Sequence, residues 1–260
     1  MAERFGDVTV EIGDDFVAEV EIHRPPNNFF DVSLIRSIAE AYETLDKDPT
    51  CRAILLCSEG KHFCAGADFN QESDAAPIPE AGAASLYQEA VRLFRSELPV
   101  VAAVQGAAIG GGLGVACSAD FRVGAPEARF AANFARLGFH QGFGLSATLP
   151  RIIGEQRALE LFYTGRRING EEAEAIGLLD RLVPLDGLRA SARELAREIA
   201  GSAPLAVRSI RRTMRGHLAD EVARATERED TEQIRLRTTA DFAEGTRASF
   251  ERRDPVFTGR

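Results

Sequence analysis

A run of 19 uncharged residues, PVVAAVQGAAIGGGLGVAC from Pro99 to Cys117, most constrains what this chain can fold into. Its length reaches that of a membrane-spanning helix. However, it contains five glycines and Gln105, and its other side chains are mostly Ala and Val. Because glycine is costly to order in a helix, a buried strand, a turn and the start of a helix explain the run better. We therefore expect no membrane segment.

The composition of the 260-residue chain, with 45% apolar and 27% charged residues, is typical of globular proteins. Its net charge of −9 argues against a general binder of nucleic acid or anionic membranes, since both need a basic surface. An anionic small molecule needs only a local positive site and is not excluded. The four cysteines form no CxxC pair, and the acidic start MAERFGDVTVEIGDD has no apolar signal region. We therefore expect a cytoplasmic protein with reduced thiols.

The order of periodic segments predicts an α/β protein. Alternating residues at Val8–Ile12 and Phe16–Ile22 indicate a β-hairpin, and helical spacing from Val32 indicates a first helix with Asp31 as its N-cap. Arg52–Cys57 is typical of a short buried strand, and PVVAAVQG, DFRVGA and ARFAAN predict further strands. Continuous apolar strands that alternate with helices favour a parallel sheet covered by helices.

The pattern after Gly144 is almost entirely helical. Asn169 followed by Glu172 predicts a capping box at one helix start. We expect an α/β core over residues 1–200 and a helical C-terminal region over residues 201–260. The sequence contains no internal repeat and no low-complexity linker.

The glycine cluster AIGGGLGVACSAD does not match a nucleotide-binding loop. A Walker loop ends in Lys-Ser or Lys-Thr, which is absent, and the dinucleotide fingerprint fails because its third glycine position is Cys117. What remains is a strand that leads into a glycine-rich helix start, where unpaired N–H groups and the helix dipole favour negative charge. This arrangement suits an oxyanion hole. Close packing of a helix against a strand is the alternative explanation.

A second small-residue turn, GKHFCAGADF (Gly60–Phe69), follows the strand at Arg52–Cys57. FCAGAD followed by VQGAAIGGGLGVACSAD resembles the paired signature of the enoyl-CoA hydratase/isomerase (crotonase) superfamily. HRPPNNFFDVSLI, ARFAANFARLGF, LPRIIGEQRALELFYTGRRINGEEAEAIGLLDRLVP and FAEGTRASFERRDPVF extend the resemblance along most of the chain. It implies a crotonase-type spiral core of repeated ββα units and a helical C-terminal trimerisation region. It also implies a homotrimer or a hexamer, and an acyl-CoA thioester as substrate, with no metal or redox cofactor.

The resemblance places the two amides of an oxyanion hole on Ala67 and Gly111. It also implies that backbone near Ala65 and Asp68 holds the adenine end of coenzyme A and that the Pro26–Asn27 turn lies along its pantetheine. The residues expected to contact the substrate are Pro26, Asn27, Ala65, Gly66, Asp68, Gly110, Gly114 and Phe134. Asp68 can equally serve as a turn-forming carboxylate.

The sequence departs from the family where a typical hydratase carries two catalytic glutamates, because those positions hold Gly114 and Phe134. A positioned acid or base typically contributes about 10²–10⁴-fold to the rate. His140, in the loop LGFHQGFG, has a suitable ordinary pKa for proton transfer, and Gln141 can orient a water. The alternative is that His140 only caps or packs this loop.

Other charged residues have ordinary explanations. Glu72 and Asp74 lie in an Ala- and Pro-rich loop, where solvated carboxylates are the default. Four arginines share one helical face, and the acidic stretch DEVARATEREDTE that follows suggests ion pairs. We favour a solvated face for these arginines, which are Arg208, Arg211, Arg212 and Arg215.

Three classes of function follow from this sequence. The first is an acyl-CoA enzyme that stabilises a thioester enolate and catalyses hydration or isomerisation. Because the glutamates are missing, decarboxylation, hydrolysis and retro-aldol reactions are alternatives for this enzyme. The second is a catalytically weak acyl-CoA-binding subunit. The third, a nucleic-acid-binding protein, is disfavoured by the charge of −9.

Overall fold

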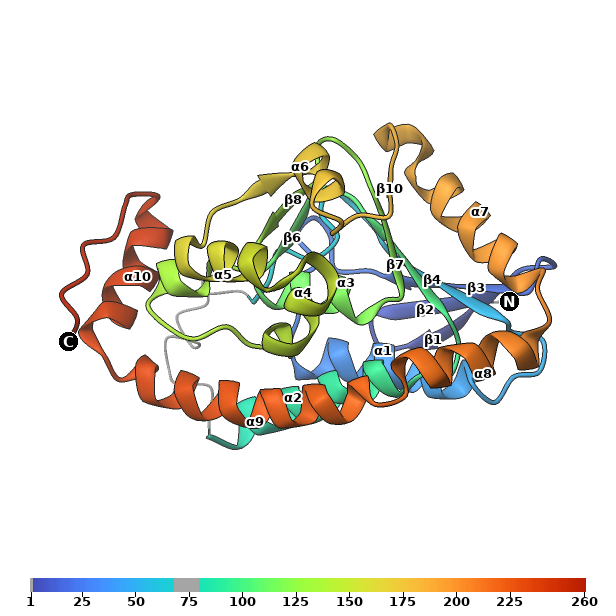
Figure 1. The fold of residues 1–260 in the computed structure, drawn as a ribbon, viewed down its shortest axis with the longest axis horizontal. Coiled ribbons are helices and arrows are strands. Elements are labelled where there is room, and N and C mark those ends of the chain that lie inside the picture. The colour runs from blue at the N-terminus through green and yellow to red at the C-terminus, as the bar shows by residue number, and fades with distance from the viewer. Residues whose placement is uncertain (1, 68–79) are drawn as a thin grey trace.

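The computed structural model describes residues 2–67 and 80–260, and a seven-stranded sheet forms its centre (Figure 1). The strand order is β1-β2-β3-β4-β5-β7-β10. β1, β2 and β3 pair antiparallel, as the predicted hairpin requires, and the other neighbours pair parallel. The strands span Glu3–Phe5 (β1), Val8–Ile12 (β2), Val17–Ile22 (β3), Ala53–Ser58 (β4), Val100–Val104 (β5), Phe121–Gly124 (β7) and Arg181–Leu182 (β10).

Both faces of the central sheet are covered, which is why β4 and β5 are apolar except for Ser58 and are fully buried. Leu55 of β4 and Val101 of β5 face α7 (Leu188–Ala200), whose Ala192 and Ala196 allow it to approach closely. The alternate residues of both strands face the larger core, which includes α1 (Val32–Leu45). In Figure 1, α7 lies apart from the other helices, on the opposite side of the sheet from α1.

A second sheet of three short strands continues from the first. β6 (Ala107–Ile109) pairs parallel with β8 (Arg129–Ala131), which pairs antiparallel with β9 (Ile168–Asn169). Gly106 joins β5 to β6 with φ +56°, and a Cβ there would collide with the Lys61 carbonyl oxygen. Apart from the two-residue strands β9 and β10, the regular structure after Gly144 is helical, as expected.

The helices begin mostly where the sequence predicts. Asp31 accepts a hydrogen bond from the Leu34 N–H at 2.8 Å and so caps α1, as expected. Asn169 likewise caps α6, but Glu172 bonds to Arg166 and does not complete a capping box. The remaining helices before the C-terminal region span Glu80–Arg95 (α2), Gly111–Ser118 (α3), Asn133–Leu137 (η1), Leu145–Ile153 (α4), Glu155–Thr164 (α5), Gly170–Ala175 (α6) and Leu185–Gly187 (η2).

The uncharged run Pro99–Cys117 divides among β5, β6 and α3. Within residues 2–67 and 80–260, no helix has both the length and the apolar character needed to span a bilayer.

The last part of the chain forms α8 (Pro204–Arg215), α9 (Leu218–Arg237) and α10 (Ala240–Glu251). α9 packs along α2 and α4, and α10 packs against η1, so these helices wrap the core (Figure 1). Glu229 of α9 is completely buried and accepts the N–H groups of Gly144 and Ser146 at the start of α4.

Three of the four α8 arginines are not solvated as we favoured, and Arg212 is, with 72% of its side chain exposed. Arg211 and Arg215 are mostly buried and pair with Asp120, with Nε–Oδ distances of 3.0 and 3.1 Å. Arg208 and Arg212 pair with Glu97. Their partners therefore come from the corner between α2 and β5 and from the end of α3, and not from the acidic stretch after α8.

Candidate active site

Two chain segments far apart in the sequence lie side by side at the join of the two sheets. Cys64 forms an isolated parallel bridge with Ala108. The Cys64 N–H donates to the Ala107 carbonyl at 2.9 Å, and the Ile109 N–H donates back to the Cys64 carbonyl at 3.1 Å. These bonds hold the turn that ends at Ala67 against the strand that leads into α3.

Glycines allow the close approach of these two segments. Gly66 has φ +99°, and a Cβ on it would lie 3.0 Å from the Ile109 carbonyl oxygen. A Cβ on Gly112, in the first turn of α3, would collide with the carbonyl of Cys64. Gly110, just before α3, has φ +56°. A larger residue at Gly112 would therefore separate the turn from the helix start.

The two segments border a cavity of about 1110 Å³, lined on one side by the core and on the other by α9 and α10. Ala67 and Gly111 both line it. Gly111 is the first residue of α3, so its N–H lies at the positive end of the helix dipole. Among the hydrogen bonds between described residues, neither the Ala67 N–H nor the Gly111 N–H has an acceptor.

Most of the other expected contact residues line the same cavity, and these are Asn27, Ala65, Gly66, Gly110 and Phe134. The backbone orders part of this set, because the Ala65 N–H donates to the Asn27 carbonyl at 2.9 Å. Pro26 is not among the lining residues; its carbonyl accepts the His62 N–H. Asp68, Glu72 and Asp74 lie outside the described residues.

Gly114, which we expected to contact substrate, packs against Phe143. A Cβ on Gly114 would lie 2.6 Å from the Cβ and Cδ1 of Phe143, and Gly114 does not line the cavity. Phe143 is 1% exposed and has φ +62°. The space beside α3 at this position is therefore filled by an aromatic ring from the loop before α4.

Phe134, at the second glutamate position, does face the cavity. It lies in η1, and its ring packs edge-on against Phe139 with centroids 5.4 Å apart. Its Cζ lies 3.7 Å from where a Gly110 Cβ would be. Phe30 and Phe143 form a second edge-on pair, 5.7 Å between centroids. Among the described residues, the wall beside Gly110 and Gly111 is thus aromatic.

The position of His140 argues against our hypothesis that it transfers protons. Its side chain does not line the cavity, whereas Gly142 and Phe143 of the same loop do. The ring Nδ1 lies 2.8 Å from the Gln141 carbonyl oxygen, and the Gln141 side chain donates to Ser146 at 3.0 Å. The alternative interpretation, that His140 packs the loop, fits this geometry.

A polar group of side chains in the cavity was missed by the sequence analysis. The Tyr87 hydroxyl donates to Gln233 Oε1 at 2.9 Å, and Arg237 Nη2 donates to the same oxygen at 3.3 Å. Burial raises the pKa of Tyr87 and lowers that of Arg237. Tyr87 comes from α2 and the other two from α9, so no local motif connects them.

His62 is a further cavity residue, and its role is partly set by the backbone. Its Nδ1 accepts the Ala107 N–H at 3.0 Å, so the neutral ring carries its proton on Nε2. Burial and the neighbouring Lys61 lower the pKa of His62, which keeps the ring neutral at pH 7.

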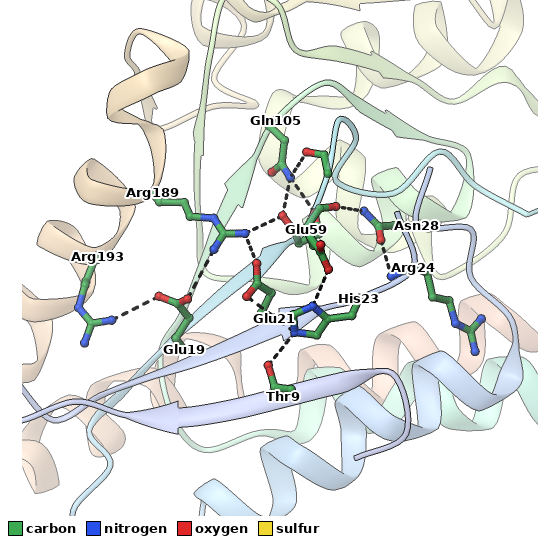
Figure 2. A network of polar contacts seen from close by, with 12 residues as sticks. Thr9, Glu19, Glu21, His23, Arg24, Asn28, Glu59, Gln105, Arg189 and Arg193 are labelled. Atoms are coloured by element: carbon green, nitrogen blue, oxygen red, sulfur yellow. Dashed lines mark hydrogen bonds and ion pairs between the residues drawn. The ribbon is translucent and has the colours of Figure 1, made fainter. Parts of the chain in front are cut away.

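A network of buried amides fixes the loop that precedes Cys64 (Figure 2). Asn28, with no exposed surface, donates through Nδ2 to the carbonyls of Glu59 and His62 at 2.7 and 2.6 Å. Gln105 donates to the Ser58 carbonyl at 2.7 Å. Since each bond ties the loop to the strand junction beneath it, the turn at Ala67 starts from a rigid base.

The fold and the cavity match one class of protein. The family model for "Enoyl-CoA hydratase/isomerase" matches residues 13–260. The chain therefore belongs to the enoyl-CoA hydratase/isomerase family, and its α/β core with a helical C-terminal region is of the crotonase type.

Individual relatives agree with this assignment. A carnitinyl-CoA dehydratase from Salmonella enteritidis PT4 is 33% identical, over 94% of this chain and 95% of the relative. The crystal structure of an enoyl-CoA hydratase/isomerase from Pseudoalteromonas atlantica T6c superposes with a TM-score of 0.85 at 30% identity, over 97% of this chain and 100% of that one. An enoyl-CoA hydratase from Mycobacterium avium subsp. paratuberculosis K-10 gives a TM-score of 0.83 at 27% identity, over 98% and 100% of the two chains.

Proposed function

We propose that this protein is an acyl-CoA-processing enzyme of the hydratase/isomerase type in which the Ala67 and Gly111 N–H groups stabilise a thioester enolate. The observation that carries the proposal is that both residues line one cavity from two segments that are hydrogen-bonded to each other. In hydration, water adds its oxygen to C3 and a proton reaches C2 through an enolate whose charge rests on the thioester oxygen. Two fixed N–H donors lower the energy of that charge without reorganisation.

Coenzyme A fits the charges at the cavity mouth. Besides Arg237, four Lys or Arg residues line the cavity, and these are Lys61, Arg129, Arg167 and Arg252. All four are exposed. In a chain with a net charge of −9, this is the local positive site that a phosphate-bearing carrier needs. We propose that the pantetheine arm of coenzyme A lies beside Asn27 and Ala65 and that the enzyme uses no further cofactor.

The proton transfers cannot follow the two-glutamate scheme, because position 114 is glycine packed on Phe143 and position 134 is phenylalanine. Among the described lining residues, Glu127 is the one carboxylate, and it is exposed. This observation favours a second candidate, decarboxylation of an acyl-CoA that carries a carboxylate on C2. Loss of CO₂ leaves its electron pair on C2 and gives the same enolate without a base.

We further propose that the protein assembles as a trimer or a pair of trimers. What supports this is the outer face of α8, which exposes Leu205, Ile210 and Met214 to 82, 63 and 60%.

The first experiment is incubation with crotonyl-CoA, followed by a wider thioester panel, in D₂O with mass spectrometry. Addition of one D₂O supports hydration, and deuterium uptake without hydration supports an enolate site used for another reaction. Thioester binding with neither event anywhere in the panel contradicts the enzyme proposal and supports a binding subunit.

The amide itself is tested by Ala67→Pro, which removes the N–H, against Ala67→Ser, which keeps it. We expect the proline variant to lose about 10²–10³-fold in turnover or exchange, as removal of one oxyanion donor does. The serine variant should stay within about tenfold of the wild type. Equal rates for the two variants contradict a role for this N–H.

A further inference from the structure

One end of the cavity carries an unusual polar cluster, formed by Tyr87, Gln233 and Arg237. A chain of contacts separates it from Gly111. The Phe30 ring lies against Gly111, and Phe30 packs on Phe143. Gly142, the residue before Phe143, lies against the Tyr87 hydroxyl and the Gln233 amide. The cluster is therefore beyond the aromatic pair as seen from Gly111.

Arg237 has no counterion within the described part of the chain. It forms no ion pair with a described carboxylate, and its Nε is buried without a hydrogen-bond partner. Its Nη2 donates a hydrogen bond to Gln233 Oε1. Its guanidinium carbon lies 5.6 Å from the centroid of the Phe139 ring. Asp230 attracts it electrostatically, but the two do not pair, and Asp230 Oδ1 is also buried without a partner.

The side chains around Arg237 orient its guanidinium group as a hydrogen-bond donor. Gln233 Nε2 donates to the His140 carbonyl at 2.9 Å, so its Oε1 faces Tyr87 and Arg237. The Tyr87 hydroxyl and the Arg237 guanidinium thus converge on one acceptor. A guanidinium with an unused N–H beside a hydroxyl suits a carboxylate, which accepts several charge-assisted bonds at once.

We propose that the acyl group of the natural substrate ends in a carboxylate, which Arg237 and Tyr87 bind at the end of the chain remote from the thioester. This rests on the proposed acyl-CoA function and narrows it to dicarboxylic acyl-CoA thioesters. An uncharged acyl chain offers the guanidinium and the hydroxyl no charged acceptor, so the cluster favours the carboxylated chain over it.

The test compares thioesters of equal chain length with and without a terminal carboxylate: glutaryl-CoA against pentanoyl-CoA, and adipoyl-CoA against hexanoyl-CoA. Dissociation constants are measured by calorimetry at fixed salt for the wild type, Arg237→Met and Arg237→Lys. Arg235→Met is the matched control, because Arg235 lies on the same helix, is 65% exposed and pairs with Glu232. Deuterium exchange at C2 is followed in parallel.

The wild type should bind the carboxylated member of at least one pair about tenfold more tightly or better. Arg237→Met should abolish this ratio by weakening the binding of the carboxylated thioester about tenfold or more. Arg235→Met should keep the full ratio, and Arg237→Lys part of it.

Equal or weaker binding of both carboxylated thioesters by the wild type overturns the proposal, as does an unchanged ratio in Arg237→Met. If Arg237→Met does not fold, the affinity ratios measured for the wild type and for Arg237→Lys decide whether the proposal holds. Equal binding of charged and uncharged thioesters with C2 exchange refutes only the carboxylate site. Absence of binding by every thioester and by coenzyme A refutes the proposed function as well.

Discussion

Replacing Gly114 by alanine tests whether this glycine exists to accommodate Phe143. The added Cβ would lie 2.6 Å from the Phe143 Cβ, well short of the 3.4 Å at which van der Waals contact becomes ordinary. Phe143 has little room to move away, because it is 1% exposed and sits between Gly142, packed on Tyr87, and Gly144, packed on Val222. Either α3 or the loop before α4 must therefore shift.

The size of the effect follows from two opposing terms. Forcing an extra methyl group into a filled core costs about 1–3 kcal/mol. Alanine in place of glycine within a helix returns about 0.5–1 kcal/mol. We expect Gly114→Ala to lower the free energy of unfolding by about 1–2 kcal/mol.

Urea unfolding followed by circular dichroism measures this change, at one protein concentration because assembly contributes to apparent stability. Gly201→Ala is the matched control. Gly201 has φ −71° and its nearest atoms lie at 3.4 and 3.5 Å, so alanine there should be neutral or stabilising by up to about 1 kcal/mol.

A double-mutant cycle identifies Phe143 as the cause. Phe143→Gly removes both the ring and the Cβ, and glycine readily adopts the φ of +62° found there. In the Phe143→Gly background, Gly114→Ala should leave the free energy of unfolding unchanged or raise it. The reasoning is refuted if Gly114→Ala is as stable as the wild type, or if it costs the same with and without Phe143.

Three further predictions concern groups outside the cavity. Asp120→Asn leaves Arg211 and Arg215 without their carboxylate in a site where Asp120 is only 9% exposed, and should cost about 3–5 kcal/mol in the same unfolding assay; a loss below about 1 kcal/mol contradicts this. Burial raises the pKa of Cys64 to about 12 and that of Cys117 to about 11, so none of the four buried thiols should react with a disulfide reagent at pH 8 until the chain is unfolded. Because the unfolded chain ionises these thiols from about pH 9 while the folded chain keeps them protonated, the free energy of unfolding should fall as the pH rises above 9, and a flat profile to pH 10.5 would contradict it.

Local patterns were sufficient to predict most of the fold. The two-residue period of the hairpin, the Asp31 cap and the continuous apolar strands each depend on residues adjacent in the sequence, and each prediction is confirmed. The strands β9 and β10 were missed because each has only two residues, too few to show a period.

Apart from Phe134, the candidate site was predictable where it is made of backbone. The family resemblance placed the two amides on Ala67 and Gly111, in small-residue turns that follow two strands, and both residues line the cavity. The packing role of Gly114 could not be predicted, since nothing near it in the sequence shows that Phe143 occupies the adjacent space. Arg237 was missed for the same reason, because its importance depends on which side chains surround it after α9 packs on α2.

The partners of the α8 arginines show the same limit. Helical spacing places Arg211 and Arg215 on one face, but it does not specify the direction in which that face points. The nearest acidic residues in the sequence were therefore the wrong partners. Asp120 became available only because α8 lies across the end of α3.

Helix α3 is held at both ends, with Gly111 at the cavity and its last carbonyls under α8. Arg215 donates to the carbonyls of Ser118 and Ala119 at 2.9 and 3.2 Å, which places a cation at the negative end of the helix dipole. The tilt of α3, and with it the direction of the Gly111 N–H, thus depends on residues about one hundred positions further along the chain. Over evolutionary time, the glycine run and the C-terminal helices are therefore expected to change together. A chimera with the C-terminal region of a relative is expected to change the direction of the Gly111 N–H.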